Sequence, residues 1–232
     1  MAATLQREDE LRRAMAADVA HELRTPVTIL RGVSEEVLDG LAEPGLDMVR
    51  SFHEEVLRLE RIVDDLATLS SAEAAGLSLR RDRVDLAGVA EQAVGQLRHR
   101  FQEAGQDVEV ILTGPRELLA VDGDEIRLGQ VVTNLLTNAT AVTPRGGRIE
   151  VAVAREAGEV RLTVTDSGPG IPPEERERVF ERFFRGRGAG DRPGSGIGLA
   201  VVAELVRVHG GQVRAGGPPG RGAVFTVTLP AG

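Results

Sequence analysis

Apolar residues in the first third of the chain recur at alternating steps of three and four. The first such stripe comprises Val19, Leu23, Pro26, Leu30, Val33 and Val37, and the second comprises Val49, Phe52, Val56, Leu59, Val63 and Leu66. This rhythm is typical of helices that pack along one stripe, and the glycine- and proline-containing residues 39–45 predict a turn between them. Because a lone hairpin buries only one stripe of each helix, we expect two copies to pair as a homodimer with a four-helix bundle.

A different pattern begins near residue 77. Helices are predicted at 85–104, 124–142 and 197–209, with a further helical piece at 174–184, and strands at 107–112, 148–154, 159–165, 211–215 and 223–229. Residues 76–84 are predicted to form a linker. We therefore expect two domains in an α+β protein: a helical hairpin over 1–76, and over 77–232 an α/β sandwich with helices on one face of a mixed sheet.

Composition excludes several classes of function. The formal net charge of −8 argues against a nucleic-acid binder. All 28 basic residues are arginine, which excludes the lysine-dependent P-loop nucleotide site, and the lack of cysteine excludes disulfides and thiolate chemistry. The charged N-terminus is not a signal peptide, and no apolar run approaches the roughly 18 residues of a membrane helix. The sequence predicts a soluble segment without membrane contact.

The segment from Ala20 to Pro26 carries the first candidate chemistry. His21 lies two residues after Val19, about 200° around the helix and away from the packing stripe. Near neutral pH an exposed imidazole is a nucleophile, and the adjacent Glu22 can accept its Nδ1 proton and leave Nε2 free to attack. A solvated surface histidine beside the proline at position 26 would give the same pattern.

Asn134 and Asn138 form a second candidate site. A spacing of four places both amides on one face of the predicted helix over 124–142. Amide oxygens can complete the shell of a Mg²⁺ ion that already holds phosphates and water. Two exposed helix asparagines are the alternative.

Glycine-rich segments supply the remaining candidates. Asp166 ends a predicted strand and can accept a hydrogen bond from an amino group such as that of adenine, and Gly168, Gly170 and Ile171 follow it. Gly194, Gly196 and Gly198 precede Leu199 at the start of a helix, where exposed main-chain amides can bind phosphate. Between these segments, residues 180–185 combine three phenylalanines with Arg185, which can meet a phosphate group.

Taken in order, these five motifs resemble the H, N, G1, F and G2 boxes of the sensor histidine kinases of two-component systems, over nearly the whole chain. That family combines a dimerising phosphoacceptor hairpin with an ATP-binding sandwich of the gyrase and chaperone ATPase type. The resemblance implies ATP-dependent autophosphorylation, transfer to an aspartate of a response-regulator receiver domain, and phosphatase activity toward that regulator. It also implies a cytoplasmic location for this segment and a sensor, often anchored in a membrane, in the parent protein.

The resemblance also implies a role for each matching residue. His21 would be the phosphoacceptor, Glu22 its acid/base partner and Thr25 the residue that orients water for dephosphorylation of the regulator. Asn138 would bind Mg²⁺ with support from Asn134. The remaining matches would hold ATP: Asp166 at the adenine amino group, Gly168, Gly170 and Ile171 beside it, Arg185 at the phosphates, and Gly194, Gly196, Gly198 and Leu199 in the mobile glycine segment.

One departure from the family pattern bears on affinity. Ala141 and Val142 stand where the family commonly has a basic and an aromatic residue after the asparagines. A phosphate contact and a stacking contact would then be missing, for which Arg145, Arg187 or Arg192 can compensate. A non-catalytic dimeric scaffold that binds a regulator is therefore a second hypothesis. A related ATPase or serine kinase is a third, although neither needs the His21 segment or the helical hairpin.

Overall fold

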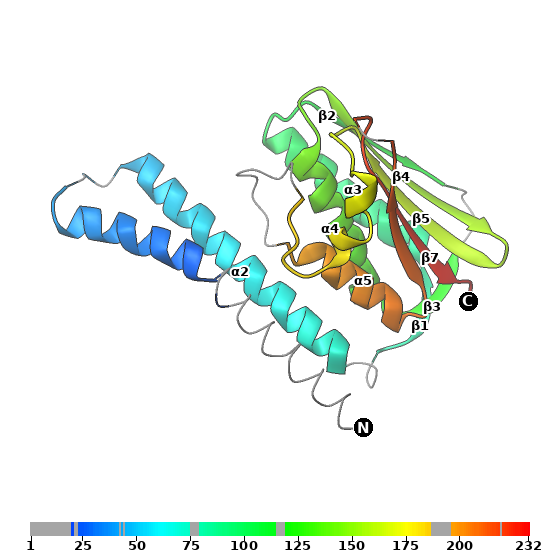
Figure 1. Ribbon diagram of the computed structural model, residues 1–232. Helices are drawn as coiled ribbons and strands as arrows, with labels where there is room; N and C mark the ends of the chain where they lie inside the picture. The colour runs from blue at the N-terminus through cyan, green and yellow to red at the C-terminus, as the bar shows by residue number, and fades with distance from the viewer. Residues whose placement is uncertain are drawn as a thin grey trace. The chain divides into compact units, whose positions relative to one another are not determined.

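The computed structural model describes residues 20, 23–41, 43, 45–74, 79–114, 119–186, 196–218 and 220–232 (Figure 1). Contacts within the chain divide it into two compact units, Met1–Ala67 and Thr68–Gly232. The predicted boundary after residue 76 falls in the segment 75–78, outside the described residues, and stays a prediction.

The first unit contains the predicted helical hairpin, except for the last turns of its second helix, which fall in the second unit. One helix covers residues 23–38, and α2 (Leu46–Ala74) follows a turn in which Gly40 adopts a φ of 70°. Pro26 is buried, whereas Val49 and Val63 of the second apolar stripe are 60% and 57% exposed. The hairpin alone therefore leaves part of its predicted packing stripe in contact with water.

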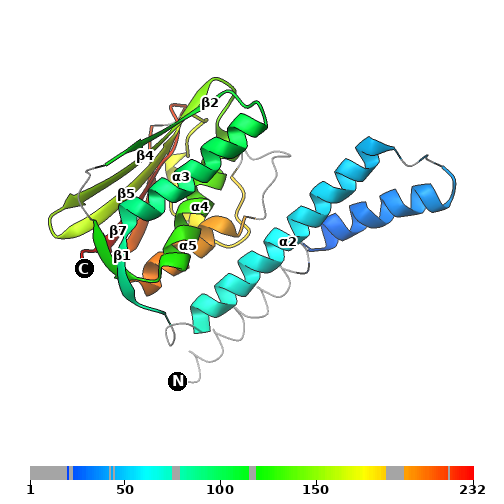
Figure 2. The ribbon, with the colours of Figure 1, turned by 180° about the vertical axis from the view of Figure 1, so that it is seen from behind.

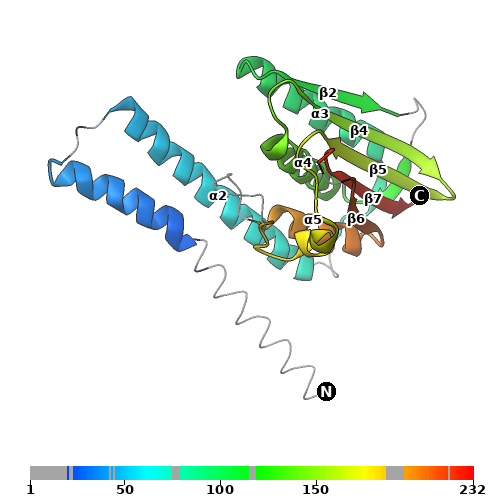
Figure 3. The same cartoon turned by 45° about the horizontal axis from the view of Figure 1, so that its top comes forward.

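The second unit is built on a five-stranded mixed sheet in the order β2-β4-β5-β7-β6 (Figure 3). Its strands are β2 (Val108–Thr113), β4 (Gly147–Glu156), β5 (Glu159–Asp166), β6 (Gln212–Gly216) and β7 (Val224–Pro230). β2 runs parallel to β4, and the other neighbours are antiparallel. Helices α3 (Leu86–Glu103), α4 (Glu125–Val142) and α5 (Gly198–Val208) cover one face, as Figure 2 shows. The predicted α/β sandwich is confirmed.

The core of this unit lies between the helices and the covered face of the sheet. Inward positions alternate along the strands because successive side chains point to opposite faces, and the helices present aliphatic residues to them. Completely or nearly completely buried side chains include those of Leu128, Leu135, Ile149, Val151, Val160, Leu162, Val201, Leu205, Phe225 and Leu229. Aliphatic packing thus replaces the aromatic core that this composition cannot supply.

A tight turn joins β4 to β5, as the alternating pattern predicts. Ala157 and Gly158 connect the strands with φ values of 50° and 84°. Two consecutive positive φ angles match the right-handed twist of an antiparallel hairpin. Residue 157 adopts this conformation although it carries a Cβ atom.

Two sequence predictions are wrong. The expected linker over 76–84 ends in β1 (Asp82–Asp85), which pairs antiparallel with the unpredicted strand β3 (Ala120–Gly123). These strands are too short to show alternation. The expected helical piece at 174–184 is two short 3₁₀ turns, Pro173–Glu175 and Arg178–Phe180. Phe183 has a φ of 59°, which a continuous α-helix does not allow.

Hydrogen bonds fix the C-terminal end of α5. The Arg81 guanidinium donates to the Val208 carbonyl oxygen over 3.0 Å. His209 is buried, its Nδ1 lies 2.7 Å from the Leu205 carbonyl oxygen, and its Nε2 accepts the Asp124 N–H over 3.0 Å. These two contacts require a neutral imidazole with its proton on Nδ1. The end of α5 is thereby joined to the start of α4 and to the segment that enters β1.

Candidate active site

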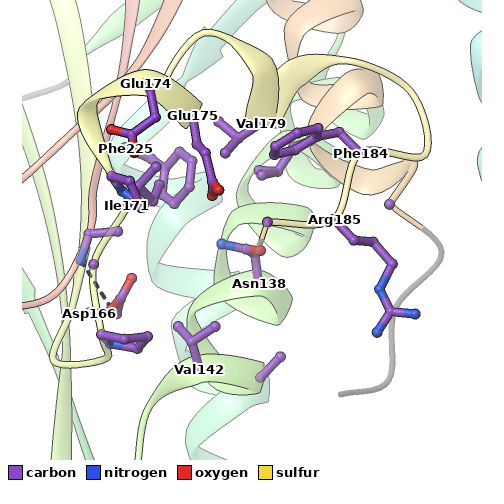
Figure 4. Close-up of a pocket in the computed structure, with 18 of the residues that line it drawn as sticks. Asn138, Val142, Asp166, Ile171, Glu174, Glu175, Val179, Phe184, Arg185 and Phe225 are labelled. Carbon is purple, nitrogen blue, oxygen red and sulfur yellow. Dashed lines mark hydrogen bonds between the residues drawn. The ribbon is translucent and has the colours of Figure 1, made fainter. Parts of the chain in front are cut away.

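A cavity of about 510 Å³ opens between α4, the end of β5 and the loop that follows it (Figure 4). α4, β5, β7, α5 and the intervening loops all contribute to its wall. The lining residues are Asn138, Ala141, Val142, Asp166, Pro169, Gly170, Ile171, Pro172, Pro173, Glu174, Glu175, Val179, Phe184, Arg185, Gly186, Gly196, Leu199, Ala223 and Phe225.

Asp166 is the last residue of β5, and Figure 4 shows its carboxylate pointing into the cavity. Oδ1 accepts the main-chain N–H groups of Gly168 and Ala223 over 2.8 and 3.2 Å. Oδ2 is buried, and no described residue donates to it. Burial raises the pKa of this carboxyl despite its two N–H donors. One oxygen is therefore held in place, and the other keeps its capacity to accept a hydrogen bond from a further donor.

Glycines allow the main chain to close around this carboxylate. A methyl group on Gly168 would lie 2.8 Å from the Val142 carbonyl oxygen and 2.9 Å from Asp166 Oδ1. A methyl group on Gly222, whose φ is 94°, would overlap the Asp166 carbonyl oxygen. Gly168 does not itself line the cavity, so it acts through the conformation of Asp166.

The structure separates the two asparagines of α4. Asn138 lines the cavity. Asn134, which was expected in the same site, lies outside it and donates from Nδ2 to the Gly198 carbonyl oxygen over 3.1 Å. This hydrogen bond joins α4 to the first residue of α5, so Asn134 holds the two helices together. Among the described residues no group of three or more His, Cys, Asp or Glu side chains could hold a metal ion.

The glycine segment and its neighbours are partly described. The cavity lining includes Gly170, Ile171, Gly196, Leu199 and Arg185, whereas Gly198 begins α5 and is not part of the lining. Gly194, Arg187 and Arg192 lie outside the described residues.

Phe183 contacts Gly196 of the glycine segment through the main chain. The Phe183 N–H donates to the Gly196 carbonyl oxygen over 2.9 Å, and both residues have positive φ angles, 59° and 70°.

The polar residues of the lining lie toward two ends of the cavity (Figure 4). Asp166 lies at one side of the cavity and Arg185 at the other, with Asn138 between them. Ala141 and Val142 also line the wall, at the positions where a basic and an aromatic residue were noted as missing. Arg145, suggested as a substitute for them, is not part of the lining.

Several lining residues escaped sequence reasoning. Phe225 reaches the cavity because β7 pairs with β5, and its ring meets Phe180 edge-on at 6.2 Å. Phe184 belongs to the motif noted at 180–185, and the Arg178 guanidinium lies 4.4 Å from its ring centroid. Glu175 is a buried carboxylate on the wall. The sequence pattern gave this position only as part of the helical piece expected at 174–184.

The segment predicted to carry the phosphoacceptor, residues 20–26, stands in the sequence at the start of the first hairpin helix. His21 and Glu22 are outside the described residues. Thr25, one turn further on, is exposed on the helix, and Pro26 beside it is buried. In the part of the chain that the structure describes, no helix has the length and apolar character to cross a membrane.

Comparisons with known proteins agree with this arrangement. Residues 123–232 match the family described as histidine kinase-, DNA gyrase B- and HSP90-like ATPase, and residues 11–75 match the His Kinase A (phospho-acceptor) domain. The chain is 37% identical to the signal transduction histidine-protein kinase BaeS of Escherichia coli K12, over 99% of this chain and 49% of BaeS. It therefore spans about half the length of that relative.

Two solved structures are similar in fold and sequence. A structure of the mycobacterial sensor histidine kinase MprB is 37% identical, with a TM-score of 0.57, over 65% of this chain and 97% of that chain. Full-length ShkA in complex with AMPPNP is 27% identical, with a TM-score of 0.66, over 94% of this chain and 46% of that chain. The chain belongs to the sensor histidine kinase family.

Proposed function

We propose that this chain transfers the γ-phosphoryl group of Mg-ATP to His21 and then to an aspartate of a response-regulator receiver domain. The observation that carries the proposal is the Asp166 carboxylate, with one oxygen fixed by two N–H groups and the other unpaired in the cavity. An exocyclic amino group of a purine supplies the missing donor.

The cavity suits adenine better than guanine. The amino group of adenine would donate to Asp166 Oδ2, whereas guanine would present a carbonyl oxygen to the same carboxylate and be repelled. Ile171, Val142 and Phe225 give the slot apolar walls. ShkA, which shares this fold, was solved with the ATP analogue AMPPNP.

The opposite end of the cavity suits phosphates and a cation. Arg185 can contact phosphate oxygens, and the Asn138 amide oxygen is a hard ligand that fits Mg²⁺. The bound cation would neutralise charge on the phosphates during transfer. Phosphate oxygens and water would supply the remaining ligands of the cation. Asn134 would support Asn138 through α5, and Gly194, Gly196, Gly198 and Leu199 would form the segment beside the phosphates.

Phosphoryl transfer would proceed in line. Glu22 accepts the Nδ1 proton of His21, Nε2 attacks the γ-phosphorus, and the bond from that phosphorus to the bridging oxygen breaks to release ADP. The phosphohistidine then donates the group to the carboxylate of the regulator. Thr25, exposed one turn beyond His21, would orient the water that later removes it.

A homodimer would complete the hairpin. Val49, Phe52 and Val63 of the predicted packing stripe are exposed, and Leu38 and Leu46 beside the turn are 83% and 78% exposed. Pairing with the hairpin of a second copy would cover such a stripe.

Incubation with ATP labelled at the γ-phosphate tests the proposal. We expect an acid-labile, base-stable label on the protein that disappears in His21→Gln and remains in the control His53→Gln, an exposed histidine on α2. Label that persists in His21→Gln would contradict the assignment.

A second candidate, a regulator-binding scaffold without turnover, is favoured by Ala141 and Val142 in the cavity wall. It predicts no label on the wild-type protein together with retained binding of a receiver domain.

A further inference from the structure

Glu175 is a second buried carboxylate of the cavity. Its residue is 7% exposed, and it ends the 3₁₀ turn Pro173–Glu175. Figure 4 shows its side chain pointing from the loop into the cavity, between Phe225 and Phe184 and toward Asn138. A carboxylate loses several kcal/mol of hydration when it is buried, unless hydrogen bonds or charges replace the water. Its place on the wall therefore requires compensation from the protein.

The carboxylate lies against the main chain at Gly186. A methyl group on Gly186 would come within 2.5 Å of Glu175 Oε2 and 3.5 Å of Cδ. Real Cβ atoms almost never approach another heavy atom below 3.0 Å. Glycine at this position thus lets the chain immediately after Arg185 pass directly over the carboxylate.

We propose that Glu175 is a positioning residue for phosphate binding: it fixes the main chain at Gly186 and so sets where the Arg185 guanidinium reaches into the cavity. This role rests on the proposed function. Arg185 has a long flexible side chain, and its own residue is exposed. The place where its backbone is anchored therefore decides how much conformational freedom is lost when the guanidinium meets a phosphate.

The two ends of the cavity make the role testable. Asp166 would bind the base and Arg185 the phosphates, so loss of Glu175 should weaken ligands that carry a triphosphate and spare those that lack one. A general collapse of the cavity would weaken both kinds of ligand equally.

The experiment measures, by calorimetry, the dissociation constants of AMPPNP and of adenosine for the full chain. For Glu175→Ala we expect AMPPNP to bind about tenfold more weakly, which corresponds to loss of the charge-assisted contact between Arg185 and a phosphate group. The affinity for adenosine should change less than about twofold. Glu175→Gln keeps the shape and one acceptor oxygen and should lie between. Glu177→Gln is the control, because Glu177 is exposed two residues away and does not line the cavity.

A double-mutant cycle tests the contact itself. Gly186→Ala should weaken AMPPNP selectively, because its methyl displaces the chain from the carboxylate. Adding Glu175→Ala removes the clash, so the double variant should bind no more weakly than Glu175→Ala alone. Additive losses would overturn the contact.

Two other outcomes separate this role from the proposed function. Equal losses of AMPPNP and adenosine in the Glu175 variants, or no loss of either, would overturn the positioning role while ATP binding stands. A wild-type chain that binds neither ligand would overturn the proposed function and this role with it. If Glu175→Ala fails to fold, Glu175→Gln and Gly186→Ala decide the question.

Discussion

Replacement of Asp166 by asparagine separates adenine recognition from stability. Asparagine keeps an acceptor oxygen for the N–H groups of Gly168 and Ala223, and it places an NH₂ group where the unpaired Oδ2 stood. The adenine amino group would then face a donor. Loss of a hydrogen bond to a charged group is worth about 1.5–3 kcal/mol, so ATP affinity should fall roughly 10- to 150-fold. GTP should gain relative to ATP, because guanine presents an acceptor there.

The same substitution should stabilise the empty domain. Burial raises the pKa of Asp166 above its ordinary value of 3.8, so the folded protein holds this proton more tightly than the unfolded chain. The stability of the wild type relative to Asp166→Asn is therefore greatest below about pH 3.8. It falls as pH rises through the raised pKa, after which the carboxylate is ionised in both states. At neutral pH we expect Asp166→Asn to be more stable by on the order of 1 kcal/mol.

Two measurements check this reasoning. Urea unfolding of both proteins from about pH 4 upward should show a difference in unfolding free energy that widens with pH and then becomes constant. Nucleotide titrations at neutral pH supply the affinities. A gap that does not change with pH, or an asparagine variant that binds ATP as well as the wild type, would refute the account of this carboxylate.

Three further substitutions have expected outcomes. Gly222→Ala places a methyl against a main-chain carbonyl oxygen at a φ of 94° and should lower the unfolding free energy by more than about 3 kcal/mol. Gly220→Ala, also at positive φ but with nothing within 4 Å, should lower it by about 1 kcal/mol. Equal losses of the two variants in urea unfolding would contradict this reasoning. His209→Ala removes the acceptor for the Asp124 N–H and a buried ring, and should cost about 2–4 kcal/mol in the same assay; a loss below 1 kcal/mol would show that this bond is dispensable. Ala141→Lys should strengthen ATP binding by about three- to tenfold at low salt, and unchanged affinity in calorimetry would count against a missing phosphate contact.

Much of the fold is readable from periodicity alone. The helices over 86–103 and 125–142 are long and strongly amphipathic, and the β4–β5 hairpin alternates on both sides of its turn. β1 and β3 gave no signal because four residues do not establish a period, and each is recognisable only from its partner. The segment at 174–184 looked helical because its charges and phenylalanines have helical spacing. Packing of Phe180 on Phe225 and the positive φ of Phe183 override that preference.

The residues of the candidate site were also predictable only in part. Asp166, Asn138 and Gly170 could be predicted because each belongs to a local motif whose chemistry is visible in a few letters. Asn134 could not be separated from Asn138, because helical spacing places both on one face and only the position of α5 determines which one meets the cavity. Glu175 and Phe225 belong to the wall through contacts between segments distant in sequence, which no local pattern encodes.

Helix α5 is short, and hydrogen bonds hold both of its ends. Near its first turn, Leu199 lines the cavity and the Gly198 carbonyl receives the Asn134 amide. At its last turn, the Val208 carbonyl receives the Arg81 guanidinium. Eleven residues of α-helix bend little over about 16 Å. A rigid-body tilt of α5 would therefore shift the Val208 carbonyl oxygen relative to the Arg81 guanidinium, one residue before the start of β1.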